Sequence, residues 1–322
     1  MGVNSVSRNG SIRYQIEKTL KSLCRFGESR HEAKKDHTAC RYIYSFNTMK
    51  TYIRQLNYMV DWAKENGIKL RSIDDIKLHG DEWLQWSVDK KFSSWTVSAR
   101  RSALCKLCEV PYSYFKTKIP PKKRQDVKRS RDMSKSLKYF SEAKNIEQVT
   151  FCRCTGLRLS ELKLIRGSDL YFDECGHPWL TVTRGTKGGR KRHTKLYGSP
   201  EEIEICISLC KKAKDDKVFP NVKERANTHG YRAQYCQRVY EAEKRDLSTL
   251  SHSEKVFCRK DKKGIVYDKQ ALLICSSMLG HNRYDVCALS YLYNQEWVQP
   301  FFLFFCYNYF RDTNCIVNIN LI

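Results

Sequence analysis

The sequence is poor in acidic residues and has no long apolar run. Its 322 residues hold 35 aspartates and glutamates against 59 lysines and arginines, which leaves a formal net charge of +24. No stretch approaches the roughly 18 apolar residues that a membrane-spanning helix needs, so we expect no membrane association. A charge this high exceeds what solubility requires, and it favours a polyanionic partner such as nucleic acid.

Signatures of export and of metal binding are also missing. The first fifteen residues contain no apolar segment of the kind found in secretory signals. We therefore expect a cytoplasmic protein whose fifteen cysteines stay reduced. Cys105 and Cys108 form an isolated Cys-x-x-Cys pair without a second ligand pair at zinc spacing, so we expect no metal site and no cofactor.

The chain is long enough for two domains. Apolar residues recur at helical spacing within 45–66, 81–90 and 94–109, which predicts an all-helical domain at 41–116 behind an N-terminal lead-in, or arm, at 1–40. A second domain at 136–295 is predicted to open with a helix over 142–154. It continues with a β-hairpin over 177–196, which turns at Gly188 and Gly189, and is otherwise helical. A tail at 296–322 follows.

A basic segment at 117–135 joins the two predicted domains. Counted from Lys116, it holds nine basic and two acidic residues, and its two adjacent prolines exclude a continuous helix. The segment is either a solvated hinge or a strap along a phosphate backbone. In the second case the candidate DNA contacts are Lys122, Lys123 and Arg124.

Four motifs of the second domain carry cationic or nucleophilic side chains. They are TGLRLSEL, the hairpin turn KGGRKR, HGYR, and LGH with the tyrosine that follows it. Two of the candidates stand three residues apart and so share one face of a helix. The set contains no pair of carboxylates, which argues against two-metal nuclease chemistry. The candidate residues are Arg158, Lys187, His229, Arg232, His281 and Tyr291.

This set of side chains suits chemistry on a phosphate. Arg158 alone would either reach to water along its aliphatic stem or grip an anion. Two guanidiniums together can hold the non-bridging oxygens of one phosphate and stabilise the charge of a pentavalent transition state. Tyr291 can attack phosphorus if cationic surroundings or a base such as His229 activate it. Lys187 can then protonate the departing sugar oxygen.

The order of these motifs resembles that of the tyrosine recombinases of the phage-integrase family. TGLRLSEL is similar to the first arginine box of the family, HGYR to its His-x-x-Arg box, and LGH with Tyr291 to its nucleophile box. The helical domain resembles the core-binding domain of the same family. The resemblance implies a mainly α fold with a small antiparallel β-hairpin or sheet, arranged as a two-domain clamp around DNA.

The resemblance also implies a role for each candidate. Two of them, Arg158 and Arg232, would bind the scissile phosphate, and His281 would hydrogen-bond it. His229 would be a base or stabiliser, and Tyr291 would become joined to a DNA 3′ phosphate. The remaining assignments place the general acid on Lys187, pocket support on Glu161, and further DNA contacts on Arg184, Arg190 and Lys191.

Two departures from the family pattern leave alternatives open. Tyr291 follows the histidine by ten residues instead of the usual nine, so Tyr293 is a second candidate nucleophile. More residues than usual separate Arg232 from His281, and we expect a loop or an extra helix there. The aromatic tail either docks into a neighbouring protomer or is an altered end of the chain that aggregates when exposed.

The function implied by the resemblance is site-specific recombination, with integration or excision of a mobile element and no need for metal or ATP. The expected partners are double-stranded DNA at recombination sites, sister protomers in a synaptic homotetramer, and accessory DNA-bending or excisionase proteins. Outside the synapse we expect a monomer or dimer, associated with a nucleoid of prokaryotic type. Two rival hypotheses are a DNA-binding relative that has lost catalysis and a type IB topoisomerase.

Overall fold

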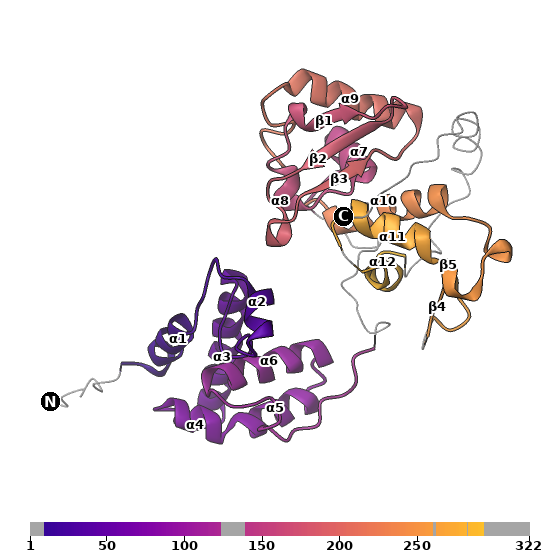
Figure 1. Ribbon diagram of the computed structural model, residues 1–322. Coiled ribbons are helices and arrows are strands. Elements are labelled where there is room, and N and C mark those ends of the chain that lie inside the picture. The colour runs from indigo at the N-terminus through magenta and orange to yellow at the C-terminus, as the bar shows by residue number, and fades with distance from the viewer. Residues whose placement is uncertain (1–9, 124–138, 260–261, 282, 293–322) are drawn as a thin grey trace. The chain divides into compact units, whose positions relative to one another are not determined.

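The computed structural model describes residues 10–123, 139–259, 262–281 and 283–292 (Figure 1). It divides into two compact units, Met1–Asp126 and Val127–Ile322, so the division falls within the predicted basic linker. Several subjects of the sequence predictions lie outside the described residues: the start of the lead-in at 1–9, the linker from Arg124 to residue 135, Tyr293, and the tail at 296–322.

The first unit is all-helical. Five of the six helices described there begin at a serine whose hydroxyl accepts a hydrogen bond from a backbone N–H of the first turn, which satisfies a donor that the helix itself leaves free. The longest helix ends before Gly67, which has a φ of +71°. The six helices are α1 (Ile12–Ser22), α2 (Arg30–Lys35), α3 (Phe46–Glu65), α4 (Ile73–Leu78), α5 (Gly80–Asp89) and α6 (Ser94–Leu107).

The core of this unit confirms three predicted helices and corrects the prediction for the lead-in. Trp83 and Leu84 of α5 and Leu104 of α6 are fully buried, as their spacing predicted. Ile16 and Leu20 of α1 are fully buried in the same core, and α1 packs against α3. The described part of the lead-in is therefore built into the helical unit and is not a free arm.

The second unit combines helices with two small sheets, which confirms the predicted fold class. Strands β1, β2 and β3 form an antiparallel sheet in that order, and β4 pairs with β5. The predicted hairpin is confirmed: Val182 pairs with Arg192 and Leu180 with Thr194 across β2 and β3. The elements are α7 (Ile146–Thr155), α8 (Leu159–Leu162), β1 (Leu170–Phe172), β2 (Pro178–Val182), β3 (Arg192–Lys195), α9 (Pro200–Ala213), α10 (Thr228–Glu243), β4 (Lys255–Phe257), β5 (Val266–Asp268), α11 (Lys269–Met278) and α12 (Asp285–Ser290).

Helix α10 lies between two apolar clusters of this unit. It contacts α7 on one side and α11 on the other (Figure 1). Tyr231 belongs to the cluster around α7, α9 and the three-stranded sheet, whereas Tyr235 belongs to the cluster around α11 and α12. Arg232 therefore stands on the helix that joins the two clusters, and its side chain is fully buried.

The segment between Arg232 and His281 contains the predicted loop: after α10, residues 244–254 form a loop with two 3-10 turns, Leu247–Thr249 and His252–Glu254. The structure adds the β4–β5 hairpin after this loop, where short runs of β-branched and aromatic residues favour extended backbone. The buried carboxylate of Asp268 accepts hydrogen bonds from Nε of Arg245 at 2.9 Å and from the backbone of Gln270 at 2.9 Å. These contacts tie the hairpin to the first turn of α11.

Two more findings concern the cysteines and the helices of the described residues. No disulfide bond joins the cysteines in the described part of the chain. None of the helices that the structure describes is long and apolar enough to cross a lipid bilayer.

Candidate active site

The turn at Thr155 and Gly156 sets the position of Arg158. Gly156 has a φ of +60°, and a Cβ atom added to it would lie 2.3 Å from the Cδ1 atom of Tyr235, so both the backbone and the space require glycine. The chain reverses there, and Arg158 becomes the residue that precedes α8. Its side chain is 16% exposed, so it is neither fully buried nor free in solvent.

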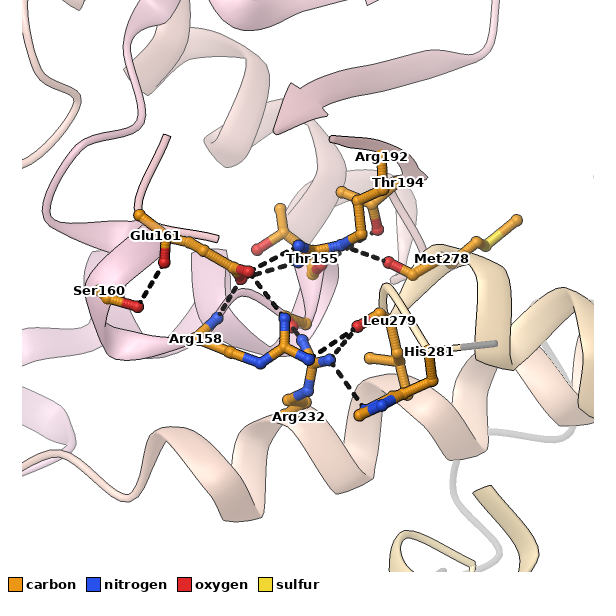
Figure 2. A network of polar contacts seen from close by, with 12 residues as sticks. Thr155, Arg158, Ser160, Glu161, Arg192, Thr194, Arg232, Met278, Leu279 and His281 are labelled. Atoms are coloured by element: carbon orange, nitrogen blue, oxygen red, sulfur yellow. Dashed lines mark hydrogen bonds and ion pairs between the residues drawn. The ribbon is translucent and has the colours of Figure 1, made fainter. Parts of the chain in front are cut away.

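Glu161 holds Arg158 in place. One of its carboxylate oxygens accepts the backbone N–H of Arg158 at 2.7 Å, and the other accepts Nη1 of the same residue at 2.8 Å. Arg192 donates to the same two oxygens, at 2.6 and 2.8 Å (Figure 2). Burial alone would raise the pKa of Glu161, but the hydrogen bonds and charges of the two arginines lower it to about 2. The carboxylate is therefore ionised at neutral pH.

Arg232 is a buried cation with no carboxylate contact among the described residues. Its Nη1 donates to the carbonyl of Gly156, and its Nη2 donates to the carbonyl of Leu279. Its Nε donates to the hydroxyl of Tyr291 at 3.0 Å. Burial lowers the pKa of Arg232, although an arginine stays charged at neutral pH. A buried guanidinium that no carboxylate compensates would be stabilised by an anion that reached it.

Helices α11 and α12 bring the histidine and the tyrosine to Arg232. The carbonyl of Leu279, just after α11, also accepts Nη2 of Arg158 at 3.3 Å, so one oxygen joins both arginines (Figure 2). Nε2 of His281 lies 3.4 Å from the hydroxyl of Tyr291 and 3.5 Å from Nη2 of Arg232. Tyr291 follows α12 directly and is 8% exposed. The structure thus gathers four of the six predicted residues.

The other two candidates lie at exposed positions. Lys187 begins the short 3-10 turn Lys187–Gly189 at the tip of the β2–β3 hairpin. His229 lies in the first turn of α10, three residues before Arg232. The roles of all six candidates stay predictions, including those of the four that lie together.

Two arginines of the hairpin segment pair with carboxylates from other parts of the unit. Arg184 forms an ion pair with Asp169 and donates from Nε to the carbonyl of Leu164 at 3.1 Å. Arg192 points inward to Glu161 instead of outward. The candidate DNA contacts Lys122, Lys123, Arg190 and Lys191 are exposed, and so is Arg184 despite its ion pair.

Arg192 is the pocket residue that the sequence reasoning missed. Burial alternates along β3: Arg192 and Thr194 are buried, and His193 between them is exposed. The signal that would have found it is this two-residue period, which puts Arg192 on the same face as Thr194. Because both faces of the strand carry polar residues, hydrophobicity does not show which face points inward.

One group of side chains in the described part of the chain has the composition of a metal site. Asp173, Cys175 and His177 lie in the turn between β1 and β2, with ligand atoms within 4.8 Å of one another. The oxygens of Asp173 accept the backbone N–H groups of Cys175 and His177 at 3.0 and 2.8 Å, and Nε1 of Trp179 at 2.8 Å. These bonds close the turn, so its geometry is accounted for without an ion. Among the described residues, Glu161 is the carboxylate that contacts the pocket arginines, and it is already shared by Arg158 and Arg192.

The comparison with protein families matches the helical unit. Residues 41–110 match the phage integrase N-terminal SAM-like domain. This match confirms, for the helical unit, the resemblance to the phage-integrase family that the sequence predicted. A comparison with curated proteins finds no match.

Among solved structures, the chain is similar to recombinases and an integrase. The XerH site-specific recombinase bound to palindromic difH substrate, in a post-cleavage complex, is 14% identical with a TM-score of 0.49, and the match covers 88% of this chain and 91% of that one. The Tn1549 transposon integrase in complex with circular intermediate DNA is 11% identical with a TM-score of 0.41, covering 86% and 93%. XerA recombinase is 13% identical with a TM-score of 0.27, covering 88% and 99%.

Proposed function

We propose that the chain is a tyrosine site-specific recombinase that cuts and rejoins DNA through a 3′-phosphotyrosine bond. One observation carries the proposal: Nε of the buried Arg232 donates to the hydroxyl of Tyr291 at 3.0 Å. A phosphate that binds to Arg232 would therefore meet the tyrosine hydroxyl. The order of the motifs, the net charge of +24 and the match of the helical unit support the same function.

The charge of the pocket suits the transition state of phosphoryl transfer. Three arginines, 158, 192 and 232, face one carboxylate, that of Glu161, which leaves a surplus of two positive charges. A phosphodiester carries one negative charge, and its pentavalent transition state carries two. Fixed cations in a buried site stabilise this extra charge more strongly than water does.

The proposed reaction exchanges one ester bond for another. The oxygen of Tyr291 attacks phosphorus, the bond from phosphorus to the 5′ oxygen breaks, and the phosphate stays attached to the 3′ carbon and to the tyrosine. The phenolic proton leaves to a base, for which His229 is the candidate, while His281 is the imidazole within 3.4 Å of the hydroxyl. Lys187 supplies a proton to the departing 5′ oxygen. Attack by a 5′ hydroxyl of another strand reverses these steps, so no ATP is consumed.

The proposed partner is duplex DNA at a defined recombination site. The basic hairpin tip and the exposed lysines at 122 and 123 would contact its phosphates. Two protomers would bind each site and four would form the synapse, with accessory DNA-bending or excisionase proteins. Integration or excision of a mobile element is the proposed biological role, in a cytoplasmic, nucleoid-associated setting.

Covalent trapping tests this function. Duplexes made from the DNA that flanks the gene would each carry one nick, so that cleavage releases a short fragment and religation is blocked. The protein should form an adduct that survives detergent, Tyr291→Phe should form none, and Tyr293→Phe should retain it. Mass spectrometry of the adduct identifies the modified residue.

Two other outcomes would support the rival functions, and a third would change only the nucleophile. Tight DNA binding without any adduct would indicate a relative that has lost catalysis. Relaxation of supercoiled plasmids that lack the site would indicate a type IB topoisomerase. An adduct on Tyr293 would support the recombinase function and identify Tyr293 as the nucleophile instead of Tyr291.

A further inference from the structure

Arg192 contacts both structural elements that carry the phosphate-binding groups. Its guanidinium makes two parallel hydrogen bonds to Glu161, the carboxylate that orients Arg158. Its Nε donates to the carbonyl of Met278 at 2.8 Å, at the end of α11. The side chain is 4% exposed, so these contacts, drawn in Figure 2, form out of solvent.

The first contact decides how much of the charge of Arg158 is left for a substrate. Glu161 accepts hydrogen bonds from Arg158 and from Arg192, and one carboxylate can neutralise only one of these cations. Two parallel hydrogen bonds to Arg192 make it the stronger partner. Without Arg192, Glu161 would be neutralised by Arg158, which would then attract a phosphate less.

The second contact, from Arg192 to the carbonyl of Met278, fixes the turn that follows α11. Met278 is followed by Leu279, whose carbonyl accepts both Arg158 and Arg232. Gly280 comes next, with a φ of +65°, and a Cβ atom added to it would lie 2.9 Å from Cδ of Arg192. The turn is therefore packed directly on the Arg192 side chain, and the backbone after it leads into His281.

We propose that Arg192 is a positioning residue for the reaction of this pocket. It neutralises Glu161 and fixes the end of α11, so that Arg158 and Arg232 are aligned and their charge is available to the scissile phosphate. This inference rests on the proposed function. Arg192 itself need not touch the DNA, because its effect passes through Glu161 and the Leu279 carbonyl.

The sharpest test removes the charge of Arg192 and then the charge of Glu161. In single-turnover cleavage of the nicked duplex, Arg192→Met should slow adduct formation by roughly 10²-fold, the cost of a misplaced reacting group. DNA affinity should change little. Adding Glu161→Gln should restore at least part of the lost rate, because Arg158 is then no longer held by an unbalanced carboxylate. Arg192→Lys, which keeps the charge and loses the paired geometry, should be intermediate.

The pH dependence separates a positioning role from a merely structural one. Without Arg192, the pKa of Glu161 should lie higher than in the unmutated protein, because only Arg158 would still oppose the effect of burial. Protonation of the carboxyl would then free Arg158. The ratio of the Arg192→Met rate to the unmutated rate should therefore rise as the pH is lowered. In the double variant, which has no carboxyl at this position, the ratio should be flat.

Arg238→Met is the matched control. Arg238 also makes a two-pronged, partly buried pair with a glutamate, Glu202, and it lies on the same helix as Arg232. It should lose a similar amount of thermal stability and keep its cleavage rate. Equal rates for the Arg192→Met and Arg238→Met proteins would overturn the proposal, as would a lack of rescue by Glu161→Gln.

A readout without DNA keeps this proposal separate from the proposed function. If the unmutated protein forms no adduct, the recombinase function fails, but Arg192 still has a measurable effect. The Nε–H resonance of Arg158, assigned through Arg158→Lys, should shift in the Arg192→Met protein and stay in place in the Arg238→Met protein. An unchanged resonance in both would contradict the inference.

Discussion

The guanidinium of Arg232 donates a hydrogen bond to the carbonyl of Gly156, although the two residues are 76 positions apart in the chain. Gly156 forms the turn that presents Arg158, so this bond links the two arginines through the backbone. The phosphate-binding groups are thus held as one unit, in which a local distortion at either end reaches the other.

Gly156→Ala should be strongly destabilising, because the new Cβ atom meets both a left-handed φ of +60° and the ring of Tyr235 at 2.3 Å. The combined cost is about 2–4 kcal/mol in the free energy of unfolding, measured by chemical denaturation. Gly176→Ala is the control, since Gly176 has a φ of +77° with nothing within 4 Å of the added atom. It should cost about 1–2 kcal/mol, from the backbone alone. Equal losses would show that the contact with Tyr235 is unimportant.

Arg232→Lys should separate DNA binding from cleavage. The lysine keeps a positive charge, but it cannot donate at once to Tyr291 and to the two carbonyls that Arg232 contacts. Binding of duplex DNA should persist, while the rate of adduct formation should fall by roughly 10²- to 10³-fold. Gel-shift titration and single-turnover cleavage measure the two quantities. A variant that cleaves at the original rate would remove Arg232 from the reaction.

Asp268 should make stability fall in acid. Burial alone would raise its pKa, but hydrogen bonds from Arg245 lower it to about 2, against an ordinary value of 3.8. A carboxyl whose pKa is depressed on folding stabilises the protein above the unfolded pKa, and this contribution is lost as the pH falls from near 4 through about 2. Because the Arg245 side chain is 37% exposed, we expect only about 1–2 kcal/mol.

The measurement compares the unmutated protein with Asp268→Asn by urea denaturation at several pH values. The difference in unfolding free energy should be constant at neutral pH and should shrink once the pH falls below 4. A difference that does not vary with pH would mean that the negative charge of Asp268 contributes nothing to the free energy of unfolding.

Local signals explain why so much of the helical architecture was predictable from sequence. Ser45 and Gly67 mark the two ends of α3, and the apolar spacing between them gives its buried face. Such signals act within a few residues. The role of α1 was not visible in this way, because only Ile16 and Leu20 of its eleven residues are buried and the rest are polar or partly exposed.

The candidate site was predictable only where its chemistry lies in side-chain motifs. The sequence pointed to Arg158, Arg232, His281 and Tyr291, and the structure brings them together. The carbonyl of Leu279, which joins the two arginines, is a backbone group that any residue supplies and so leaves no trace in the sequence. The contact of Arg192 with Glu161 depends on which face of the polar strand β3 points inward, and the sequence does not show this either.

The basic linker should contribute to the salt dependence of DNA binding. Each neutralised phosphate releases about 0.9 of a counterion, so the logarithm of affinity falls linearly with the logarithm of salt concentration. Replacing Lys122, Lys123 and Arg124 by alanine should make that slope shallower by about 1 for each phosphate that the linker no longer neutralises. Alanine at Lys211 and Lys212, in the last turn of α9, is the control and should leave the slope unchanged. An unchanged slope in the linker variant would favour a solvated hinge.

The last prediction concerns the general acid. Lys187 is exposed at the tip of the β2–β3 hairpin, where DNA would reach it. A general acid contributes roughly 10²- to 10⁴-fold when the leaving oxygen is strongly basic, so Lys187→Ala should slow cleavage of ordinary DNA by about that factor. Replacing the bridging 5′ oxygen with sulfur gives a thiolate, which leaves without a proton. Lys187→Ala should therefore cleave the sulfur substrate at nearly the unmutated rate.

Arg158→Ala is the comparison that makes this result specific. Arg158 would stabilise charge on the non-bridging oxygens, which the substitution does not alter, so sulfur should leave this variant slow. Rescue of both variants would mean that sulfur merely accelerates every reaction. If sulfur rescues neither, Lys187 is only a DNA contact. The acid would then be sought first at Arg190 and Lys191, which are exposed on the same hairpin, because Arg184 is already paired with Asp169.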